Sequence, residues 1–487
     1  MNTAVNKRCT NPTCGGNGNC ATCPKRVSEK FNDDTFDAVT EYTVSKKDDT
    51  GNCYTQNGVC NEGKDKYAIA IDLGTTTLAF ALIDKASAQV LHTVTALNSQ
   101  RKYGADVLSR IQTSVGGKRE ELRECIQKDI CVGIDRLLEE YKFTAKNRNA
   151  NPVEQIVIAG NTTMIHLLMG YDCSTLGVYP FTPVNTNLIS GSSKEILGYT
   201  LQNTEITTIV LPGISAFIGG DIVAGLYAVD IAEQEEITLF IDLGTNGEMA
   251  IGNCDRILTT SVAAGPAFEG GNISCGTGSV AGAICSVDIE YKQEKDNYDV
   301  NCKTIQDKSS CGICGTGVIE TVAELLKNEM IDETGLYIDE FFETGFLLSA
   351  PNGVNRISDM GNKEEIVFTQ KDIREFQMAK AAVRAGIDIL ISQYGINTEE
   401  IKNVYLAGGF GFHLNIEKAV SVGLLPGEVC DKVKVVGNSS LGGMVKFLSD
   451  KDKMTKVQKI LDITQEIILA DNEEFNAKYL CSMAFDA

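Results

Sequence analysis

Two short segments of this chain place a carboxylate, a glycine and hydroxyl groups at the end of an apolar run. In the first, the apolar residues Tyr67 to Ile71 lead into DLGTTT at residues 72–77, and a second apolar run begins at Leu78. This pattern predicts a strand, a tight turn and another strand. The tip of such a hairpin offers N–H groups and hydroxyls to phosphate oxygens, and its carboxylate suits hydrated Mg²⁺.

The motif recurs as DLGT at residues 242–245, again between two apolar runs. An internal repeat of this kind indicates two related lobes with one hairpin tip each. Two facing tips would hold the two ends of one phosphate chain. A pair of ordinary hairpin turns is the alternative interpretation. The chain has no GxxxxGK[ST] motif, so neither segment is a Walker loop.

A third candidate site is a group of cysteines near the N-terminus. Six of the 17 cysteines fall within the first 60 residues, namely Cys9, Cys14, Cys20, Cys23, Cys53 and Cys60. The segment is otherwise polar and poor in large aliphatic residues, so it cannot form a core without a metal or cross-links.

Three clustered cysteines and one remote cysteine are typical of a plant-type [2Fe–2S] site, although the first gap here is five residues rather than four. We expect the ligands to be Cys14, Cys20, Cys23 and Cys53, with Cys60 competing for the fourth position and Cys9 as a substitute. A structural zinc site made by the first four cysteines of the chain is one alternative. Redox-inert thiols are the other.

Composition limits the kinds of partner. The chain has 487 residues, so two or three domains are expected, and a net charge of −21 argues against nucleic acid or an anionic membrane as partners. No apolar run approaches the ~20 residues that span a bilayer. The first nine residues are polar and lack a signal-peptide core, which favours a cytoplasmic protein.

The elements between the motifs alternate in type. Apolar spacing predicts amphipathic helices at 120–141 and 371–394, the second ending at Gly395 with Lys380 on its polar face. The strand 404–407 leads into a glycine-rich loop, LAGGFG at 406–411, that would lie flat against a nucleoside. The loop 263–271 is poor in bulky side chains, so a ligand could approach its backbone.

Several single residues have more than one interpretation. His166 and His413 are expected to have packing or loop roles rather than to bind a ligand. Cys311 and Cys314 form a CxxC, but a glycine turn onto a helix N-terminus is the preferred interpretation. Asp221 either caps a helix or points into a nucleotide cleft.

The two hairpins and the late glycine-rich loop resemble the superfamily of acetate and sugar kinases, heat-shock chaperones and actin, whose two lobes close over ATP. The resemblance implies an α/β protein with a duplicated actin-like two-lobe ATPase fold, preceded by a small Cys-rich metal-binding segment. The expected divisions are 1–65 for the Cys-rich iron–sulfur segment, 66–205 for the first lobe, and 206–487 for the second lobe with C-terminal elements.

The whole combination resembles the reductive activators of corrinoid proteins. Motifs that carry this resemblance include AGNTTM at 159–164, LPGISAFIGGDIVAGL at 211–226, IDLGTNGE at 241–248 and AAGPAFEGGNISCG at 263–276. Members of that family usually have a full ferredoxin domain, a linker and a middle domain. Here the Cys-rich segment is short, and we expect it to join the ATP-binding domain almost directly.

The resemblance implies an ATP-hydrolysing enzyme that passes one electron from an iron–sulfur cluster to a Co(II) corrinoid and so restores Co(I). The cofactors would be ATP, Mg²⁺ and the cluster. The expected catalytic carboxylates are Asp72, Asp242 and Glu248, of which the two aspartates orient Mg²⁺ or water. The residues expected to contact the nucleotide are Gly74, Thr75, Thr76, Thr77, Gly244, Thr245, Asn246, Gly247, Gly265, Gly408, Gly409 and Phe410.

The implied partners are the corrinoid protein of a methyltransferase system and an external low-potential electron donor, and a homodimer is compatible with this interpretation. Three rival functions use the same nucleotide site. They are a small-molecule kinase, an activator of the 2-hydroxyacyl-CoA dehydratase type, and a non-enzymatic ATP-dependent binding protein. A zinc ion in place of the cluster would favour the last of these.

Overall fold

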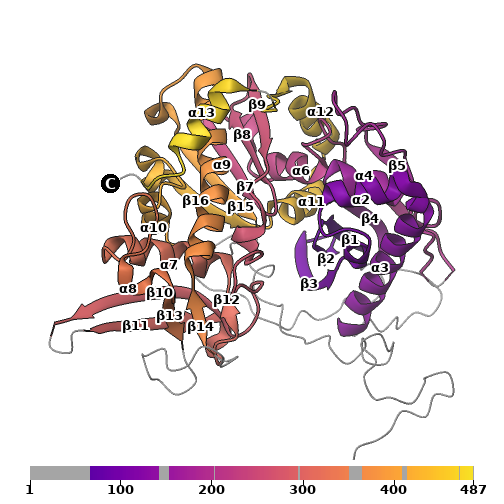
Figure 1. Ribbon diagram of the computed structural model, residues 1–487. Coiled ribbons are helices and arrows are strands. Elements are labelled where there is room, and N and C mark those ends of the chain that lie inside the picture. The colour runs from indigo at the N-terminus through magenta and orange to yellow at the C-terminus, as the bar shows by residue number, and fades with distance from the viewer. Residues whose placement is uncertain are drawn as a thin grey trace, which may run out of the picture.

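The computed structural model describes residues 66–141, 153–201, 203–293, 297–349, 365–408, 414–470 and 472–485. These residues form two α/β lobes, each built on a six-stranded sheet (Figure 1). None of the helices in these ranges is both long enough and apolar enough to cross a membrane. Nine residues for which we predict a role lie outside the described ranges, namely Cys9, Cys14, Cys20, Cys23, Cys53, Cys60, Gly409, Phe410 and His413.

The first sheet comes from the N-terminal half of the described chain. Its strands are β1 Tyr67–Leu73, β2 Thr77–Asp84, β3 Gln89–Leu97, β4 Val153–Gly160, β5 Ile189–Ser192 and β6 Thr207–Val210. They lie in the order β3-β2-β1-β4-β6-β5. β1 pairs antiparallel with β2 and parallel with β4, and the register places Gly160 beside Leu73.

The second sheet repeats this plan. Its strands are β7 Thr238–Leu243, β8 Gly247–Gly252, β9 Ile257–Val262, β15 Asn403–Gly408, β16 Val433–Gly437 and β17 Thr464–Glu466, in the order β16-β15-β7-β8-β9-β17. The strands β9-β8-β7-β15-β16 match β3-β2-β1-β4-β6 in order and direction. Gly408 lies beside Leu243 as Gly160 lies beside Leu73. The expected duplicated fold is therefore confirmed.

Two helices lie between the sheets (Figure 1). They are α6 Gly220–Ala228, which follows β6, and α11 Ser439–Ser449, which follows β16. Side chains alternate along a strand, so Ala68 and Ala70 of β1 face these helices while Ile69 and Ile71 face the opposite core. Alanines on the inner face leave room for the helices to lie close to the sheet.

The two inner helices touch through their backbones. A side chain at Gly443 of α11 would collide with the carbonyl oxygen of Ala224 in α6. A side chain at Gly225 of α6 would meet the Phe240 ring and the Ser439 hydroxyl. Glycine at these positions is therefore required by the close approach of the helices.

Other helices cover the outer faces of the sheets. They are α3 Arg119–Glu140 and α4 Thr162–Met169 on the first lobe, and α9 Gln370–Tyr394 on the second. Both long helices expected from the sequence are confirmed, and Gly395 ends α9 in the left-handed conformation, with φ of 82°. The expected exposure of Lys380 is wrong. C-terminal residues cover it, and its Nζ donates to the carbonyl of Ala484.

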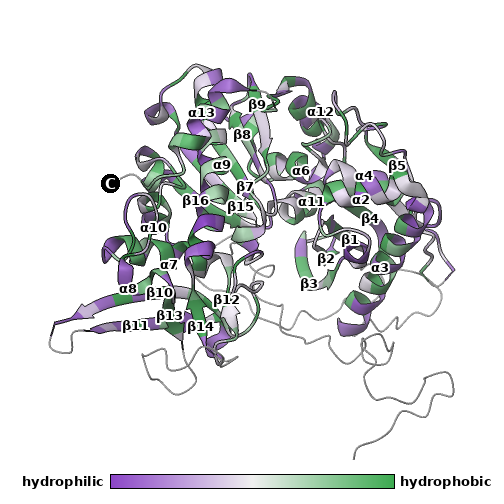
Figure 2. Ribbon diagram, in the orientation of Figure 1, coloured by the Kyte–Doolittle hydropathy of each residue, from purple (hydrophilic) through white to green (hydrophobic). Residues whose placement is uncertain are grey.

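A smaller unit is inserted between β9 and β15. It contains the sheet β11-β10-β12 and the pair β13-β14, and the free end of the β10–β11 hairpin is mostly hydrophilic (Figure 2). Its elements are β10 Ala283–Lys292, β11 Asn297–Thr304, β12 Gly312–Ile313, α7 Gly315–Lys327, α8 Asp339–Phe342, β13 Phe346–Ser349 and β14 Ile366–Phe368. The remaining helices are α2 Val107–Thr113, α5 Ser193–Leu197, α10 Ile416–Ser421, α12 Lys453–Ile463 and α13 Glu473–Cys481.

The first sheet continues past the boundary that we expect between residues 205 and 206. Strand β6 begins at Thr207 and pairs with β4, so it belongs to the first sheet. The loop after β6 then leads directly into α6, which lies between the two sheets. The chain therefore passes from one lobe to the other after β6 rather than before it.

Candidate nucleotide site

The two DLGT motifs form hairpin tips, as the sequence predicts. The first tip, residues 74–76, joins β1 to β2, and Thr77 is the first residue of β2. The second tip, residues 244–246, joins β7 to β8, and Gly247 is the first residue of β8. In each sheet the tip lies next to the end of the adjacent parallel strand, β4 or β15.

The first tip is held by its carbonyl groups. The Asn98 side chain donates to the carbonyl oxygen of Gly74 at 2.9 Å, and the Asn98 backbone N–H donates to that of Thr76 at 2.9 Å. Arg110 Nη2 donates to the carbonyl oxygen of Thr75 at 2.7 Å. All three carbonyls of the tip are thus bonded to buried groups of the first lobe.

This arrangement leaves N–H groups available. The C=O and N–H of a trans peptide point in opposite directions, so bonding the carbonyls of Gly74 and Thr75 turns the N–H groups of Thr75 and Thr76 away from those partners. Neither N–H finds an acceptor within the part of the chain that the structure describes. Successive free N–H groups form a concavity that suits an anion.

The second tip has a different environment. Gly244 N–H donates to the carbonyl of Asn246 at 2.9 Å, which closes the turn. The Thr245 hydroxyl donates to Glu269 Oε2 at 2.8 Å. Glu269 ends the short 3₁₀ helix Pro266–Glu269 that follows Gly265, whose φ is 81°. The second tip is therefore backed by a carboxylate, whereas the first is backed by a guanidinium.

The carboxylate of Asp72 links the lobes. Strand alternation places it on the same face as Ala68 and Ala70, toward α11. There the Asn438 side chain donates to Asp72 Oδ2 at 2.7 Å and the Ser440 hydroxyl donates to Oδ1 at 2.8 Å. Asn438 is also the N-cap of α11, because its Oδ1 accepts from the N–H of Leu441 at 2.7 Å.

Further carboxylates lie near Asp72. Burial and the charge of Asp72 together raise the pKa of both Asp242 and Asp221 to about 7. Glu248 is directly across the hairpin from Asp242, and burial together with the charges of Asp221 and Asp242 raises its pKa well above the ordinary value. Burial also raises the pKa of Asp72, against the hydrogen bonds from α11 that lower it.

This excess of negative charge favours a cation. In the described ranges, no Lys or Arg is among the groups that shift the pKa of these carboxylates. No set of three or more His, Cys, Asp or Glu side chains in those ranges is close enough to ligate a metal directly. A hydrated Mg²⁺ keeps several waters and needs only one or two carboxylates, which these side chains can supply.

Gly408 is the described part of the expected adenosine loop. Its φ is 108°, and a side chain there would collide with the carbonyl of Leu243 at the base of the second tip. The chain resumes after the undescribed residues 409–413 and enters α10 at Ile416, with Asn415 as the N-cap. This helix is fixed to the inserted unit by Lys418.

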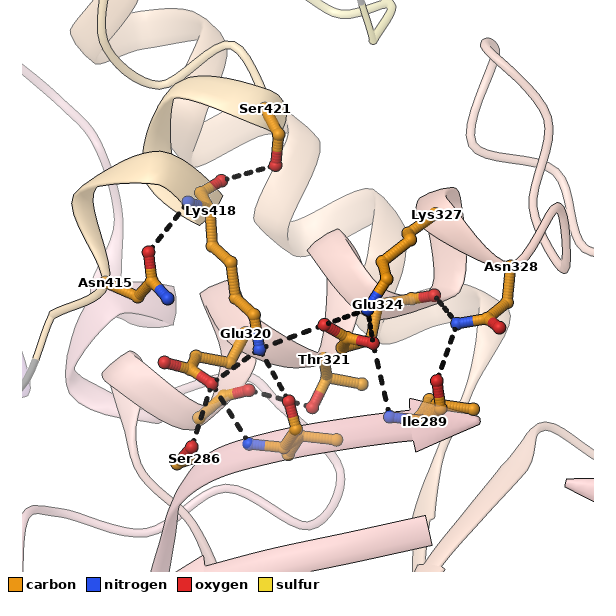
Figure 3. A network of polar contacts seen from close by, with 12 residues as sticks. Ser286, Ile289, Glu320, Thr321, Glu324, Lys327, Asn328, Asn415, Lys418 and Ser421 are labelled. Carbon is orange, nitrogen blue, oxygen red and sulfur yellow. Dashed lines mark hydrogen bonds and ion pairs between the residues drawn. The ribbon is translucent and has the colours of Figure 1, made fainter. Parts of the chain in front are cut away.

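Lys418 joins three elements in a buried polar network (Figure 3). Its Nζ donates to Glu320 Oε2 at 2.9 Å, to Glu324 Oε1 at 3.1 Å and to the carbonyl of Val287 at 2.7 Å. Both glutamates lie on α7 and are buried, and they also accept N–H groups of β10. The network therefore fixes the helix after the glycine-rich loop against α7 and β10.

A cavity of about 280 Å³ adjoins the second tip and is lined by both lobes. Asn246, Glu248 and Ser261 contribute polar atoms from the second lobe, and Asn161 contributes from the first. Most of the other lining residues are apolar, such as Phe217. The cavity thus connects the phosphate side of the site to an apolar space between the lobes.

Other candidates from the sequence have structural roles. His166 is fully buried, with Nδ1 2.7 Å from the carbonyl oxygen of Thr162, while Nε2 accepts the N–H of Val184 at 3.0 Å. Cys314 is buried and its thiol donates to the carbonyl of Ile284 at 3.2 Å. The glycine turn expected after it does lead into a helix, α7.

Several residues that build the site are not apparent from the DLGT motifs. They are Asn98, Arg110, Asn161, Glu269, Asn438 and Ser440. One signal could have identified two of them. The sequences GNTT at 160–163 and GNSS at 437–440 both follow a parallel strand and open a helix with an asparagine N-cap. In each case the amide also reaches a motif residue, Thr75 or Asp72.

The duplicated sheets, the two hairpin tips and the glycine beside each define an ATPase-type protein of the acetate and sugar kinase, heat-shock chaperone and actin class. Residues 236–487 match the family model described as the C-terminal domain of RACo, the ASKHA domain, and residues 67–234 match the RACo middle region. The chain therefore belongs to the RACo family. The match to the middle region overturns our expectation that the Cys-rich segment joins the ATP-binding domain almost directly.

Individual relatives agree with this assignment. The chain is 31% identical over 445 residues to the corrinoid activation enzyme RamQ of Eubacterium limosum, covering 87% of this chain and 71% of that protein. It is 30% identical over 449 residues to a [Co(II) methylated amine-specific corrinoid protein] reductase of Methanosarcina barkeri, covering 86% and 77%. The solved structure of a reductive activator for corrinoid, iron–sulfur protein matches with a TM-score of 0.76 at 33% identity, covering 87% of this chain and 67% of that one.

Proposed function

We propose that this protein is an ATP-dependent reductive activator that returns the Co(II) corrinoid of a methyltransferase corrinoid protein to Co(I). The observation that carries the proposal is the interlobe site, where a tip with free N–H groups and a set of raised-pKa carboxylates lie together. The relatives, which are named for corrinoid activation and Co(II) corrinoid protein reduction, supply the substrate class.

The phosphates of ATP would bind between the two tips. The N–H groups of Thr75 and Thr76 would donate from the first lobe, and the backbone N–H of Thr245 would donate from the second. Asp72 and Asp242 would hold the waters of a hydrated Mg²⁺, and Glu248, across the hairpin from Asp242, would be a further carboxylate. Gly265 and Gly408 allow the nucleotide to approach the backbone on the second lobe.

An uphill electron transfer to the corrinoid requires free energy from ATP. For one electron, about 59 mV equals a factor of ten, so an uphill gap of about 200 mV corresponds to about 4–5 kcal/mol. ATP can drive such a transfer only if it favours the transfer-competent arrangement of the lobes by a similar margin. The contacts of Asp72 with Asn438 and Ser440 tie the first tip to α11, so a nucleotide held by both tips also acts on the helix pair between the sheets.

An iron–sulfur cluster would supply the electron to cobalt after reduction by an external low-potential donor. The proposed ligands are Cys14, Cys20, Cys23 and Cys53 or Cys60. Spectroscopy and metal analysis of protein purified without oxygen address this part directly. About two iron atoms per chain with a dithionite-reducible [2Fe–2S] EPR signal are expected. One zinc and no iron would contradict the proposed electron carrier.

The activity is tested with a corrinoid protein poised as Co(II). Loss of the Co(II) EPR signal and gain of Co(I) absorbance are expected with reductant and MgATP, and not with MgADP or with no nucleotide. Reduction at the same rate without ATP would contradict the proposal. ATP-dependent phosphorylation of an acetate- or sugar-like acceptor would instead favour a kinase.

A further inference from the structure

Arg110 of α2 has an unusual environment for an arginine. Its side chain is fully buried, and all three of its hydrogen bonds go to uncharged groups. Nε donates to the carbonyl of Gly104 at 3.0 Å, Nη1 to the sulfur of Met164 at 3.2 Å and Nη2 to the carbonyl of Thr75 at 2.7 Å. Within the described ranges, Arg110 makes no ion pair with a carboxylate.

The guanidinium of Arg110 nevertheless carries its positive charge. Burial lowers the pKa of the guanidinium to about 10, so it is still protonated at neutral pH. The charge of Asp106, the N-cap of α2, raises the pKa of Arg110, but its carboxylate makes no ion pair with the guanidinium in the described ranges and instead accepts the N–H of Ser109 at 2.7 Å. A buried charge without a hydrogen-bonded ion-pair partner is costly, so an anion that approaches it is favoured.

The peptide between Thr75 and Thr76 connects Arg110 to the nucleotide site. Its carbonyl accepts from the guanidinium, and its N–H, on the opposite side, has no acceptor in the described chain. A charge-assisted bond at the carbonyl polarises the peptide and strengthens the N–H as a donor. The same bond fixes the direction in which that N–H points.

We propose that Arg110 is a positioning residue for the polyphosphate of the nucleotide, acting through the Thr75–Thr76 peptide as the buried counter-charge of the first tip. This inference rests on the proposed nucleotide-dependent function. It assigns the cationic half of the phosphate site to the first lobe, since the second tip is backed by Glu269 and Asp242 instead. It also predicts that Arg110 affects binding in proportion to the phosphate charge of the ligand.

The test compares ATP, ADP and adenosine by calorimetry on the full-length protein. In Arg110→Met, the Kd for ATP should rise about tenfold or more, that for ADP should rise less, and that for adenosine should stay within about twofold. Arg110→Lys keeps the charge and should recover most of the ATP affinity. If Arg110→Met does not fold, Arg110→Gln, which is neutral but keeps a donor, carries the same expectation.

Lys380→Met is the matched control, because it removes another buried cation, whose Nζ donates to the carbonyl of Ala484 and not to a residue of either tip. It should leave the ratio of ATP to adenosine affinity unchanged. A folded neutral variant of Arg110 that binds ATP like the wild type, or that loses ATP and adenosine equally, would overturn this inference alone. Wild-type protein that binds neither ATP nor ADP would overturn the proposed function and this inference together.

Discussion

Replacing Asn438 with aspartate separates the helix-capping role of this side chain from its hydrogen bond to the other lobe. Its Oδ1 caps α11 by accepting the N–H of Leu441, and its Nδ2 donates to the carboxylate of Asp72 on the other lobe, both at 2.7 Å. Aspartate is as good an N-cap as asparagine. Asn438→Asp therefore keeps the cap, removes the donor to Asp72 and sets a second carboxylate against the first.

The expected loss can be worked out from these contacts. A hydrogen bond to a charged group contributes about 1.5–3 kcal/mol, and an N-cap about 1 kcal/mol. Asn438→Asp should lose about 2–3 kcal/mol at pH 8, and Asn438→Ala, which loses both contacts, about 3–4 kcal/mol. The added charge raises the pKa of Asp72 further, so the loss in Asn438→Asp should shrink as the pH falls and the pair takes up a proton.

Denaturant unfolding at pH 5 and pH 8 measures both quantities. Asn415→Asp is the matched control, because Asn415 caps α10 through the N–H of Lys418 at 3.1 Å and is exposed. The control should change stability by about 0.5 kcal/mol or less at either pH. If Asn438→Asp is as stable as the wild type at pH 8, or loses the same free energy of unfolding at both pH values, Asn438 does not stabilise the charged form of Asp72.

Three further predictions concern two buried carboxylates, a buried lysine and a proposed cluster ligand. The folded-state pKa values of Asp221 and Asp242 are raised to about 7, so their stabilising contribution is complete below about pH 4 and is lost as the pH rises through 7. In thermal scans, Asp221→Asn should therefore lose less stability than the wild type as the pH rises over this range. Lys418→Met removes the lysine that pairs with buried Glu320 and leaves Glu324 paired with Lys327 alone, so it should cost about 3–5 kcal/mol in denaturant unfolding. Lys327→Met, at a side chain 64% exposed, should cost about 0.5 kcal/mol or less. Cys20→Ser should lose the bound iron in metal analysis while MgATP binding persists, and retention of iron would exclude Cys20 as a ligand.

Local patterns in the sequence are sufficient for the strands of the two motif hairpins and for two long helices. The two DLGT motifs lie on antiparallel hairpins, and the apolar stripe of 371–394 forms α9, because period-two and period-3.6 patterns report burial directly. Lys380 shows where this reasoning fails. Its position on the helix predicts exposure, but distant residues at the C-terminus cover it, and periodicity within the helix carries no information about them.

The site is predictable only in part from the sequence, because contacts with distant segments are again not encoded in a local pattern. Asp72 and Asp242 can be read from their own motifs, but the groups that hold them come from segments far away in the chain. Asn438 is 366 residues from Asp72, and Arg110 is 35 residues from Thr75. These contacts depend on how the two sheets and the inner helices pack, which no single motif encodes. The lobe boundary was misplaced for the same reason, since β6 is defined by its pairing with β4.

The glycine contact between α6 and α11 limits how the lobes can move. Helices whose side chains interlock must repack before they can shift. Gly443 lies directly on the α6 backbone and has no side chain that would interlock with it. Small translations of the two helices along their axes therefore meet little resistance. Separation of the helices would instead expose the core between the sheets. We therefore expect nucleotide binding to produce a shear of the lobes, in which the distance between the two tips changes by sliding rather than by opening.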